Sequence, residues 1–168
     1  MKVGAVPWYG ALVAAGLTAA WGLHAFDWHR FEDPKKRRLN EPQLKDGESR
    51  LGRVMALGEP GDLEPGVLVE FELPRTGRPT VSRVAAVAGQ RVALRAGELL
   101  VDGSPADDSF GLRRGPDELP EHLVPEGCVF VLNDLRTRDS AEFDSRSLGP
   151  IPVRAITLWF PPKEKRRR

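Results

Sequence analysis

Several serines could serve as nucleophiles for acyl transfer, and their value depends on whether a base accompanies them. The candidates are Ser49, Ser82, Ser140, Ser145 and Ser147. A serine hydroxyl attacks a carbonyl carbon only when a neighbouring group takes its proton. The search for a base therefore decides whether the chain can act as a hydrolase of this type.

Candidate bases are scarce in this sequence. His122 lies in PEHLVPEG, a segment typical of a solvated surface loop, and no lysine stands between Lys45 and Lys163. Arginine is no substitute, because it does not give up its proton in proteins. Three aspartates, Asp62, Asp134 and Asp144, are candidate bases, but a carboxylate would activate a hydroxyl only weakly. The sequence offers no clear nucleophile–base pair.

Metal-ligating residues are equally few. The chain has three histidines and one cysteine, without the spacing of a zinc site. We therefore expect no metal and no cofactor. Cys128, inside GCVFVL, is interpreted as a small buried apolar residue, and a single cysteine excludes an internal disulfide.

The formal net charge of +1 is unevenly distributed. Residues 51–162 carry 12 Arg, no Lys and 17 Asp or Glu, a formal charge of −5, and the basic excess lies in Lys35–Arg38 and Lys163–Arg168. A protein that binds nucleic acid normally carries its positive charge on the folded domain. We therefore expect no nucleic-acid partner.

The amino-terminal segment 3–26 contains no charged residue apart from a titratable His24. About 20 apolar residues suffice to span a bilayer as a helix. We expect an uncleaved transmembrane helix with its flanks over residues 1–28. A cleaved signal peptide is the alternative, but its apolar core would be shorter and would follow a more basic start than Lys2 alone.

The span also suggests partners and an orientation. Small residues four apart, such as Gly10 and Ala14, allow helices to approach closely, so we expect contacts with other membrane protein subunits; an Ala- and Gly-rich genome is the alternative explanation. Basic residues after the span favour a cytoplasmic body. We expect a single-pass protein of the bacterial inner membrane with this orientation. The tail 163–168 either binds anionic lipid or is a solvated end.

Beyond a polar linker over residues 29–50, short apolar runs alternate with Gly and Pro. Strand-length runs with turns between them predict an all-β domain of antiparallel sheets over residues 51–162. In GVLVEFEL, Val67, Val69, Phe71 and Leu73 alternate on one face. Gly97 should supply a positive φ in a tight hairpin, and residues 105–120 read as a loop insert. No long helical pattern follows the span.

Four segments together resemble the type I signal peptidases, or leader peptidases, which are membrane-anchored β-fold enzymes with a Ser/Lys dyad. The segments, in chain order, are EPGVLVEFELP, SRVAAVAGQRVALRAGELLVDGSP, VPEGCVFVLNDLR and FDSRSLGPIP. They are similar to the Pro-Gly-Asp strand, the Lys-Arg-Val-Val strand with its hairpin, the Gly-Asp-Asn-Arg segment, and the Asp-Ser-Arg segment of that family. Their order behind an amino-terminal apolar segment strengthens the likeness.

The resemblance implies that both dyad positions are degenerate. Gly58 stands at the nucleophile position, and Ser82, followed by Arg83, stands where the family has its lysine base. In the family that lysine is kept neutral by burial in apolar surroundings. Glu142 replaces a serine that positions the lysine, and the Gly-Asp-Asn stretch has become Asn133, Asp134 and Leu135. The sequence therefore indicates that no catalytic residue is retained.

The resemblance also implies a retained structural motif. Asp144 and Arg146 should form an ion pair, and Gly149 with Pro150 should turn the chain into the last strand. The residues assigned to this motif are Asn133, Asp134, Asp144, Ser145, Arg146 and Gly149. They belong to the scaffold of the family rather than to its dyad.

The resemblance to signal peptidases implies that the β domain faces the side where exported proteins emerge, whereas the basic residues after the span favour the cytoplasm. We favour the cytoplasm, because the degenerate dyad removes the reason for facing outward. The favoured hypothesis is a membrane-anchored, non-catalytic protein of the signal-peptidase fold that acts as an accessory or binding subunit of a membrane protein complex. Its old cleft could still bind an extended peptide by strand addition. The alternatives are an active serine endopeptidase with a non-standard catalytic site and a plain β domain tethered to the membrane.

Overall fold

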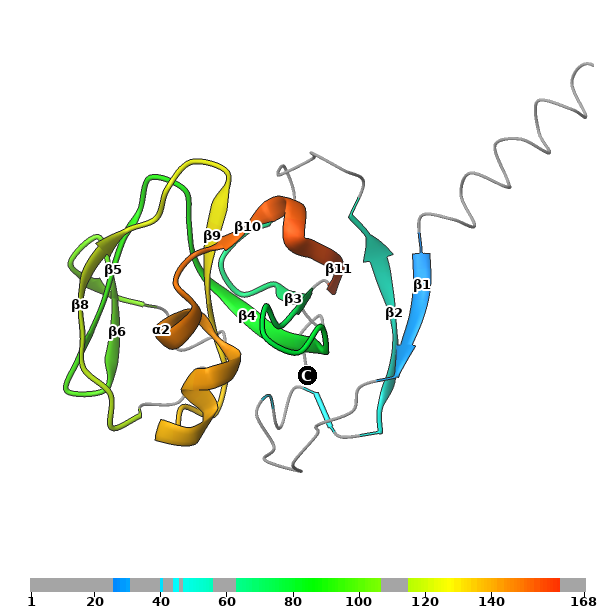
Figure 1. The fold of residues 1–168 in the computed structure, drawn as a ribbon. Coiled ribbons are helices and arrows are strands. Elements are labelled where there is room, and N and C mark those ends of the chain that lie inside the picture. The colour runs from blue at the N-terminus through cyan, green and yellow to red at the C-terminus, as the bar shows by residue number, and fades with distance from the viewer. Residues whose placement is uncertain are drawn as a thin grey trace, which may run out of the picture.

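Two antiparallel sheets form the folded body in this computed structural model (Figure 1). The structure describes residues 26–30, 40, 44–45, 47–55, 63–106 and 115–160, with the backbone alone for residues 26–29. Residues 3–25 of the predicted span, Gly58 and the basic tail lie outside the described residues. Residues 26–28, which the prediction assigned to the end of the span and its flank, instead begin strand β1 (Phe26–Arg30). Among the described residues, no helix has both the length and the apolar character needed to cross a bilayer.

The larger sheet has seven strands in the order β1-β2-β11-β3-β4-β9-β10. Their bounds are β1 Phe26–Arg30, β2 Ser49–Val54, β11 Ile156–Phe160, β3 Leu68–Glu72, β4 Pro79–Val87, β9 Cys128–Leu132 and β10 Ile151–Pro152. The smaller sheet has the order β7-β6-β5-β8. Its strands are β7 Ser104–Pro105, β6 Glu98–Val101, β5 Arg91–Arg95 and β8 Leu119–Leu123. This confirms the predicted antiparallel β architecture.

Short helical turns connect β9 to the last strand. They are the 3₁₀ helix η2 (Arg138–Phe143), the single-turn helix α2 (Ser145–Leu148) and the 3₁₀ turn η3 (Val153–Ala155). Gly149 ends α2 with a φ of 74°, and the chain then enters β10. The predicted turn at Gly149 and Pro150 is therefore present.

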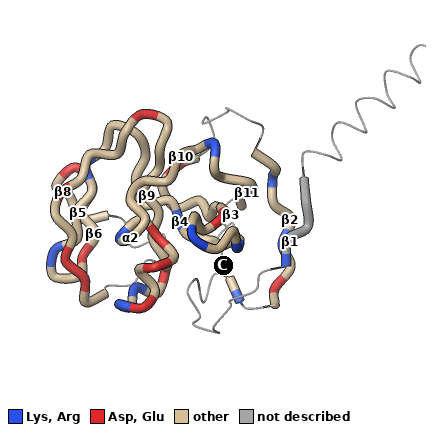
Figure 2. The backbone as a smooth tube through the Cα atoms, in the orientation of Figure 1, with Lys and Arg blue, Asp and Glu red and all other residues tan. Residues whose placement is uncertain are grey.

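Apolar residues on both faces of the large sheet form separate packing clusters. Val84, Val129 and Val131 pack on one face, while Ala86 and Phe130 pack on the other against the small sheet. A bulge between Val84 and Ala86 interrupts the pairing of β4 with β9. Strand β9 (CVFVL) is uncharged (Figure 2), whereas Glu70 and Arg83 lie inside β3 and β4.

The alternation predicted in GVLVEFEL is confirmed, but the opposite face of β3 is also covered. Val69 and Phe71 lie in the cluster that contains Val84, Val129 and Val131. Leu68, on the other face, packs with Leu44 from the predicted linker. Glu70 on this second face is 6% exposed. Strand β3 is therefore buried on both faces rather than on one.

The predicted linker, residues 29–50, contributes directly to the fold. Strand β1 ends at Arg30 and β2 begins at Ser49, so the sheet starts before residue 51. Asn40 is buried, and its side-chain amide donates to the carbonyl oxygen of Val81 at 2.7 Å. The β domain therefore extends into the stretch that its polar composition marked as a linker.

The predicted hairpin at Gly97 is present and gives a sharp stability test. Gly97 has a φ of 75°, and an added Cβ would lie 1.7 Å from the carbonyl oxygen of Gly115. We expect Gly97→Ala to lower the free energy of unfolding by about 2–3 kcal/mol, because strain and overpacking add. Gly103 has a φ of 77° and open space around its Cβ position. In urea unfolding, Gly103→Ala should cost only about 1 kcal/mol; equal losses would contradict the packing argument.

Candidate functional site

Ser82 lies in the middle of β4 and is fully buried. Its hydroxyl lies 3.0 Å from Oδ1 of Asn133 and 3.1 Å from the carbonyl oxygen of Phe143. A hydroxyl has one proton to donate, and here two carbonyl-type oxygens compete for it. Neither acceptor is a base, so this environment orients the hydroxyl without activating it.

Asn133 links Ser82 to the segment that follows β9. Its backbone N–H and its side-chain Nδ2 both donate to Oδ2 of Asp144 at 3.1 Å. Nδ2 also donates to the carbonyl oxygen of Ser140 at 2.9 Å. The amide is therefore used at both ends, and Ser82, Asn133 and Asp144 form one buried chain of hydrogen bonds.

The predicted pair of Asp144 and Arg146 is confirmed by a 2.8 Å contact between Oδ2 and Nη2. Arg146 also donates to Oδ2 of Asp117 and, at 2.7 Å, to Oγ of Ser140. Oδ1 of Asp144 caps α2 by accepting from the backbone N–H of Arg146. One arginine of α2 thus joins η2, Asp144 and the segment before β8.

Burial and charge shift the pKa values of this network in definite directions. Burial raises the pKa of Asp144, although the hydrogen bond and charge of Arg146 and the amide of Asn133 oppose the rise. Burial alone would lower the pKa of Arg146, but Asp144 and Asp117 outweigh it and raise that pKa. Burial and the charge of Arg146 lower the pKa of Arg136. The charged groups of this network therefore pair with one another and stabilise buried parts of the fold.

A second ion pair lies on the opposite face of β4. Nε of Arg83 donates to Oδ1 of Asp134, and Nη2 donates to Oδ2, both at 2.6 Å. Nη1 donates to the carbonyl oxygen of Gly66, also at 2.6 Å. Both side chains are almost fully buried. This bidentate pair fixes β4 to the end of β9, beside the residues Ser82 and Asn133.

The other serines do not complete a catalytic pair among the described residues. Ser49 is exposed at the start of β2, and Ser147 is exposed on α2. Ser145 is buried and its Oγ accepts from the backbone N–H of Val131 at 2.9 Å. His122 lies on exposed β8 in the smaller sheet, with Nδ1 2.6 Å from the carbonyl oxygen of Pro120. The structure therefore keeps His122 on a different sheet from Ser82.

Ser140 is the buried residue whose role sequence reasoning missed. Its Oγ accepts from Arg146 and from the backbone N–H of Thr137, and it contacts the carbonyl oxygens of Leu135 at 3.1 Å and Thr137 at 2.9 Å. Glu142, which the alignment of motifs placed at a serine position, is exposed. Four donors or acceptors around one hydroxyl indicate a structural centre. The signal available was a serine within a short segment bounded by Thr137 and Asp144.

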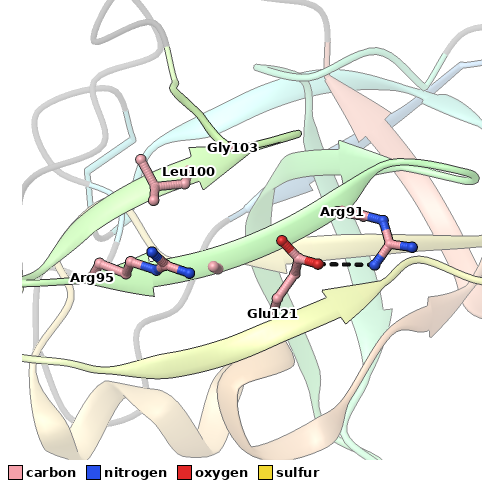
Figure 3. A pocket seen from close by; sticks show the side chains of 6 residues that line it. Arg91, Arg95, Leu100, Gly103 and Glu121 are labelled. Atoms are coloured by element: carbon pink, nitrogen blue, oxygen red, sulfur yellow. Dashed lines mark hydrogen bonds and ion pairs between the residues drawn. The ribbon is translucent and has the colours of Figure 1, made fainter.

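Two further features lie apart from this network. A hollow of about 70 Å³ on the smaller sheet is lined by Arg91, Arg95 and Glu121, among others (Figure 3). Arg91 and Glu121 form a 2.8 Å ion pair in this hollow.

The cysteine and the possible metal ligands are separate from this hollow. Cys128 is half-buried rather than buried as predicted, and it packs against the cluster that contains Ala86 and Phe130. No group of His, Cys, Asp or Glu in the described part of the chain is arranged to hold a metal ion.

Comparisons with known proteins identify the family to which these segments belong. Residues 8–157 match the family model described as signal peptidase, peptidase S26. The chain belongs to this family. The match covers most of the chain, including the segments that hold both buried ion pairs.

Curated relatives in the family are peptidases by name. Thylakoidal processing peptidase 1 of Arabidopsis thaliana is 31% identical over 109 residues, covering 60% of this chain and 31% of that protein. Probable signal peptidase I-1 of Synechocystis sp. is 32% identical over 92 residues, covering 55% of this chain and 45% of that protein. The chain thus spans less than half the length of these relatives.

Among solved structures, a signal peptidase I from Enterococcus faecalis V583 is similar, with a TM-score of 0.47 and 20% identity. The match covers 63% of this chain and all of that chain.

Proposed function

We propose that this member of the signal peptidase family is a membrane-anchored, non-catalytic protein that acts as an accessory or binding subunit of a membrane protein complex. One observation carries the proposal. The β4 residue that precedes Arg83 is a fully buried serine whose hydroxyl is bonded to two carbonyl oxygens. The family resemblance places the lysine base at this position.

The chemistry of acyl transfer supports the same conclusion. Peptide cleavage by a serine requires a base within hydrogen-bond reach of the nucleophile. Residues 46–162 contain no lysine, and Gly58 stands at the nucleophile position in the resemblance. The buried arginines, Arg83 and Arg146, are held in ion pairs and cannot serve as bases. The buried ion pairs and hydrogen bonds of these segments support a scaffold role rather than a catalytic one.

We infer the partners from the apolar amino-terminal segment and from the ability of a sheet to add a strand. The apolar segment 3–26 would place the protein in the bacterial inner membrane, with the β domain on the cytoplasmic side by the positive-inside rule. Its face of small residues would contact other membrane subunits. An extended peptide, added as a strand, is a further partner, whereas nucleic acid is not expected.

The experiment combines a cleavage assay with a co-purification. The full-length protein, extracted in mild detergent, is mixed with a precursor that carries an Ala-x-Ala site, and the products are measured by mass spectrometry. We expect no cleavage above a blank, and we expect other membrane chains to co-purify in fixed stoichiometry. An active signal peptidase serves as the positive control.

Cleavage by the pure protein would overturn the non-catalytic proposal and favour the alternative, an active endopeptidase with a non-standard site. In that case Ser49→Ala and Ser147→Ala variants would test whether either exposed serine is the nucleophile. Purification as a single chain without partners would overturn the accessory role while leaving the absence of cleavage intact.

A further inference from the structure

The outer face of the smaller sheet, which points away from the larger sheet, carries the hollow shown in Figure 3. Val92 and Leu94 of β5 are buried in the cluster between the two sheets. Because side chains alternate along a strand, Arg91, Ala93 and Arg95 lie on the opposite, outer face. All three line the hollow.

The hollow is small because its floor is a single methyl group among longer side chains. Ala93 pairs with Leu100 across the β5–β6 ladder, and both residues line the hollow. On the other side, the pairing of β5 with β8 shifts between Val92 and Leu94, and Glu121 lies within this irregular stretch of β8. The volume of about 70 Å³ is far below the roughly 300–1,000 Å³ of a pocket for a drug-sized molecule. The space therefore fits a group of a few non-hydrogen atoms.

Two charged groups at the hollow retain hydrogen-bonding capacity. Nη1 of Arg91 donates to Oε1 of Glu121 at 2.8 Å. Within the described part of the chain, neither Arg95 nor Oε2 of Glu121 forms a hydrogen bond or ion pair. In Figure 3, Arg95 extends along β5 toward Glu121, whose carboxylate lies between the two guanidinium groups. A cation and a carboxylate oxygen thus border the same small space.

This arrangement favours a ligand that accepts hydrogen bonds at one end and donates at the other. A guanidinium binds a carboxylate through two parallel N–H donors, which suits Arg95. A carboxylate or phosphate alone would also meet the negative charge of Glu121, whereas a ligand with an adjacent N–H would donate to Oε2. Ala93 and Leu100 offer apolar surface to a small aliphatic side chain. A carboxylate with a nitrogen donor and a small side chain on its α-carbon meets all three requirements.

We propose that this hollow binds a small α-amino or α-amido carboxylate. The carboxylate binds Arg95, the N–H donates to Glu121, and the side chain contacts Ala93. Two sources carry this chemistry, a free amino acid such as alanine and the carboxyl-terminal residue of a peptide. They differ in the nitrogen, which is an ammonium in the first and an amide in the second. The hollow is separate from the buried hydrogen bonds around Ser82, so the proposal goes beyond the accessory function and does not depend on it.

Four small probes test the ligand chemistry on the full-length protein in mild detergent, with Kd measured by saturation-transfer NMR. L-Alanine and N-acetyl-L-alanine carry both the carboxylate and the N–H. Propionate lacks the N–H, and N-acetyl-L-alaninamide lacks the carboxylate. We expect the better of the first two to bind about tenfold more tightly than either of the others, because each control loses one charge-assisted hydrogen bond. Preference for L-alanine would assign the free amino acid as the source, and preference for N-acetyl-L-alanine would assign the peptide end.

Substitutions at the two polar groups locate the site. Arg95→Met removes the cation and should raise the Kd of the preferred probe about tenfold. Arg78→Met, at an exposed arginine between β3 and β4, is the matched control and should leave that Kd unchanged. Glu121→Gln keeps an acceptor oxygen, so it should weaken L-alanine about fivefold and N-acetyl-L-alanine no more than about twofold. Circular dichroism checks that each variant keeps its fold.

Three results would overturn the proposal. The first is the absence of saturable binding by every probe. The second is a Kd for propionate or N-acetyl-L-alaninamide equal to that of the better α-nitrogen carboxylate. The third is an Arg95→Met variant that binds as well as Arg78→Met. None of these results alters the cleavage and co-purification outcomes, so failure of this site and failure of the proposed function are distinguishable.

Discussion

Replacing Asp134 with alanine should lower the free energy of unfolding by about 3–5 kcal/mol. Asp134 is fully buried and accepts both 2.6 Å hydrogen bonds from the Arg83 guanidinium. Without the carboxylate, that cation stays buried, with one N–H donated to the carbonyl oxygen of Gly66. An uncompensated buried charge is far more costly than the net gain from the pair itself.

Urea unfolding followed by circular dichroism measures this loss, with an exposed ion pair as the control. Arg91 and Glu121 form a pair at 2.8 Å whose side chains are 59% and 43% exposed. Glu121→Ala should therefore cost less than about 1 kcal/mol. The double variant Arg83→Met/Asp134→Leu should recover most of the loss, since it removes both charges together. A loss for Asp134→Ala as small as that for Glu121→Ala would contradict the burial argument.

Strand identity could be predicted where the pattern of apolar residues matches the burial. The run CVFVL became β9 at the predicted residues, and TVSRVAAV became β4 with one residue added. The hairpin at Gly97 was readable because a two-residue turn requires a positive φ. In these segments local preference and tertiary packing agree, which is why the sequence alone was sufficient.

Other elements could not be predicted because their stabilising contacts are distant in sequence. Strand β8 (LPEHL) is polar, contains Pro120 and is mostly exposed, so only its pairing with β5 makes it a strand. Residues Asn40 and Leu44 lie in a polar stretch and are buried by β3, β4 and β11. No periodicity marks such segments, since each contributes one or two buried residues.

The candidate site was predicted in part. The motif likeness placed Asp144 with Arg146, and the ion pair is present. The partner of Arg83 was not identified, although an arginine in β4 and an aspartate after β9 are two charges within apolar surroundings on strands that became neighbours. The pairing of Ser82 with Asn133 depends on two residues 51 positions apart, which a single sequence does not reveal.

The largest loss of stability is expected from Ser82→Lys. The side chain of Ser82 is enclosed by Asn133 and by the backbone of Phe143, and the site is fully buried. A lysine here would overfill the site and would place an ammonium group away from water, in surroundings where the direct partners of position 82 are carbonyl-type oxygens. We expect a loss of about 4 kcal/mol or more in the free energy of unfolding, combining overpacking with desolvation.

A second substitution, at Asn133, tests whether lack of space explains the expected loss of stability in Ser82→Lys. In the Gly-Asp-Asn motif that this segment resembles, a glycine stands at the position of Asn133. The two side chains share a hydrogen bond, and we expect the small residue at position 82 and the large one at position 133 to compensate each other in volume. Ser82→Lys/Asn133→Gly should be less destabilised than the sum of the two single variants, with a coupling of about 1–3 kcal/mol.

The double-mutant cycle, measured by urea unfolding, separates volume from charge. A favourable coupling would mean that Asn133 occupies the space that a lysine side chain needs, so loss of the base and filling of its site are linked changes. Ser82→Met/Asn133→Gly supplies the control for volume without charge, and it should show a similar coupling. If the losses of unfolding free energy are additive in both double variants, the compensation is refuted. Asn133 would then not occupy the space that a larger side chain at position 82 needs.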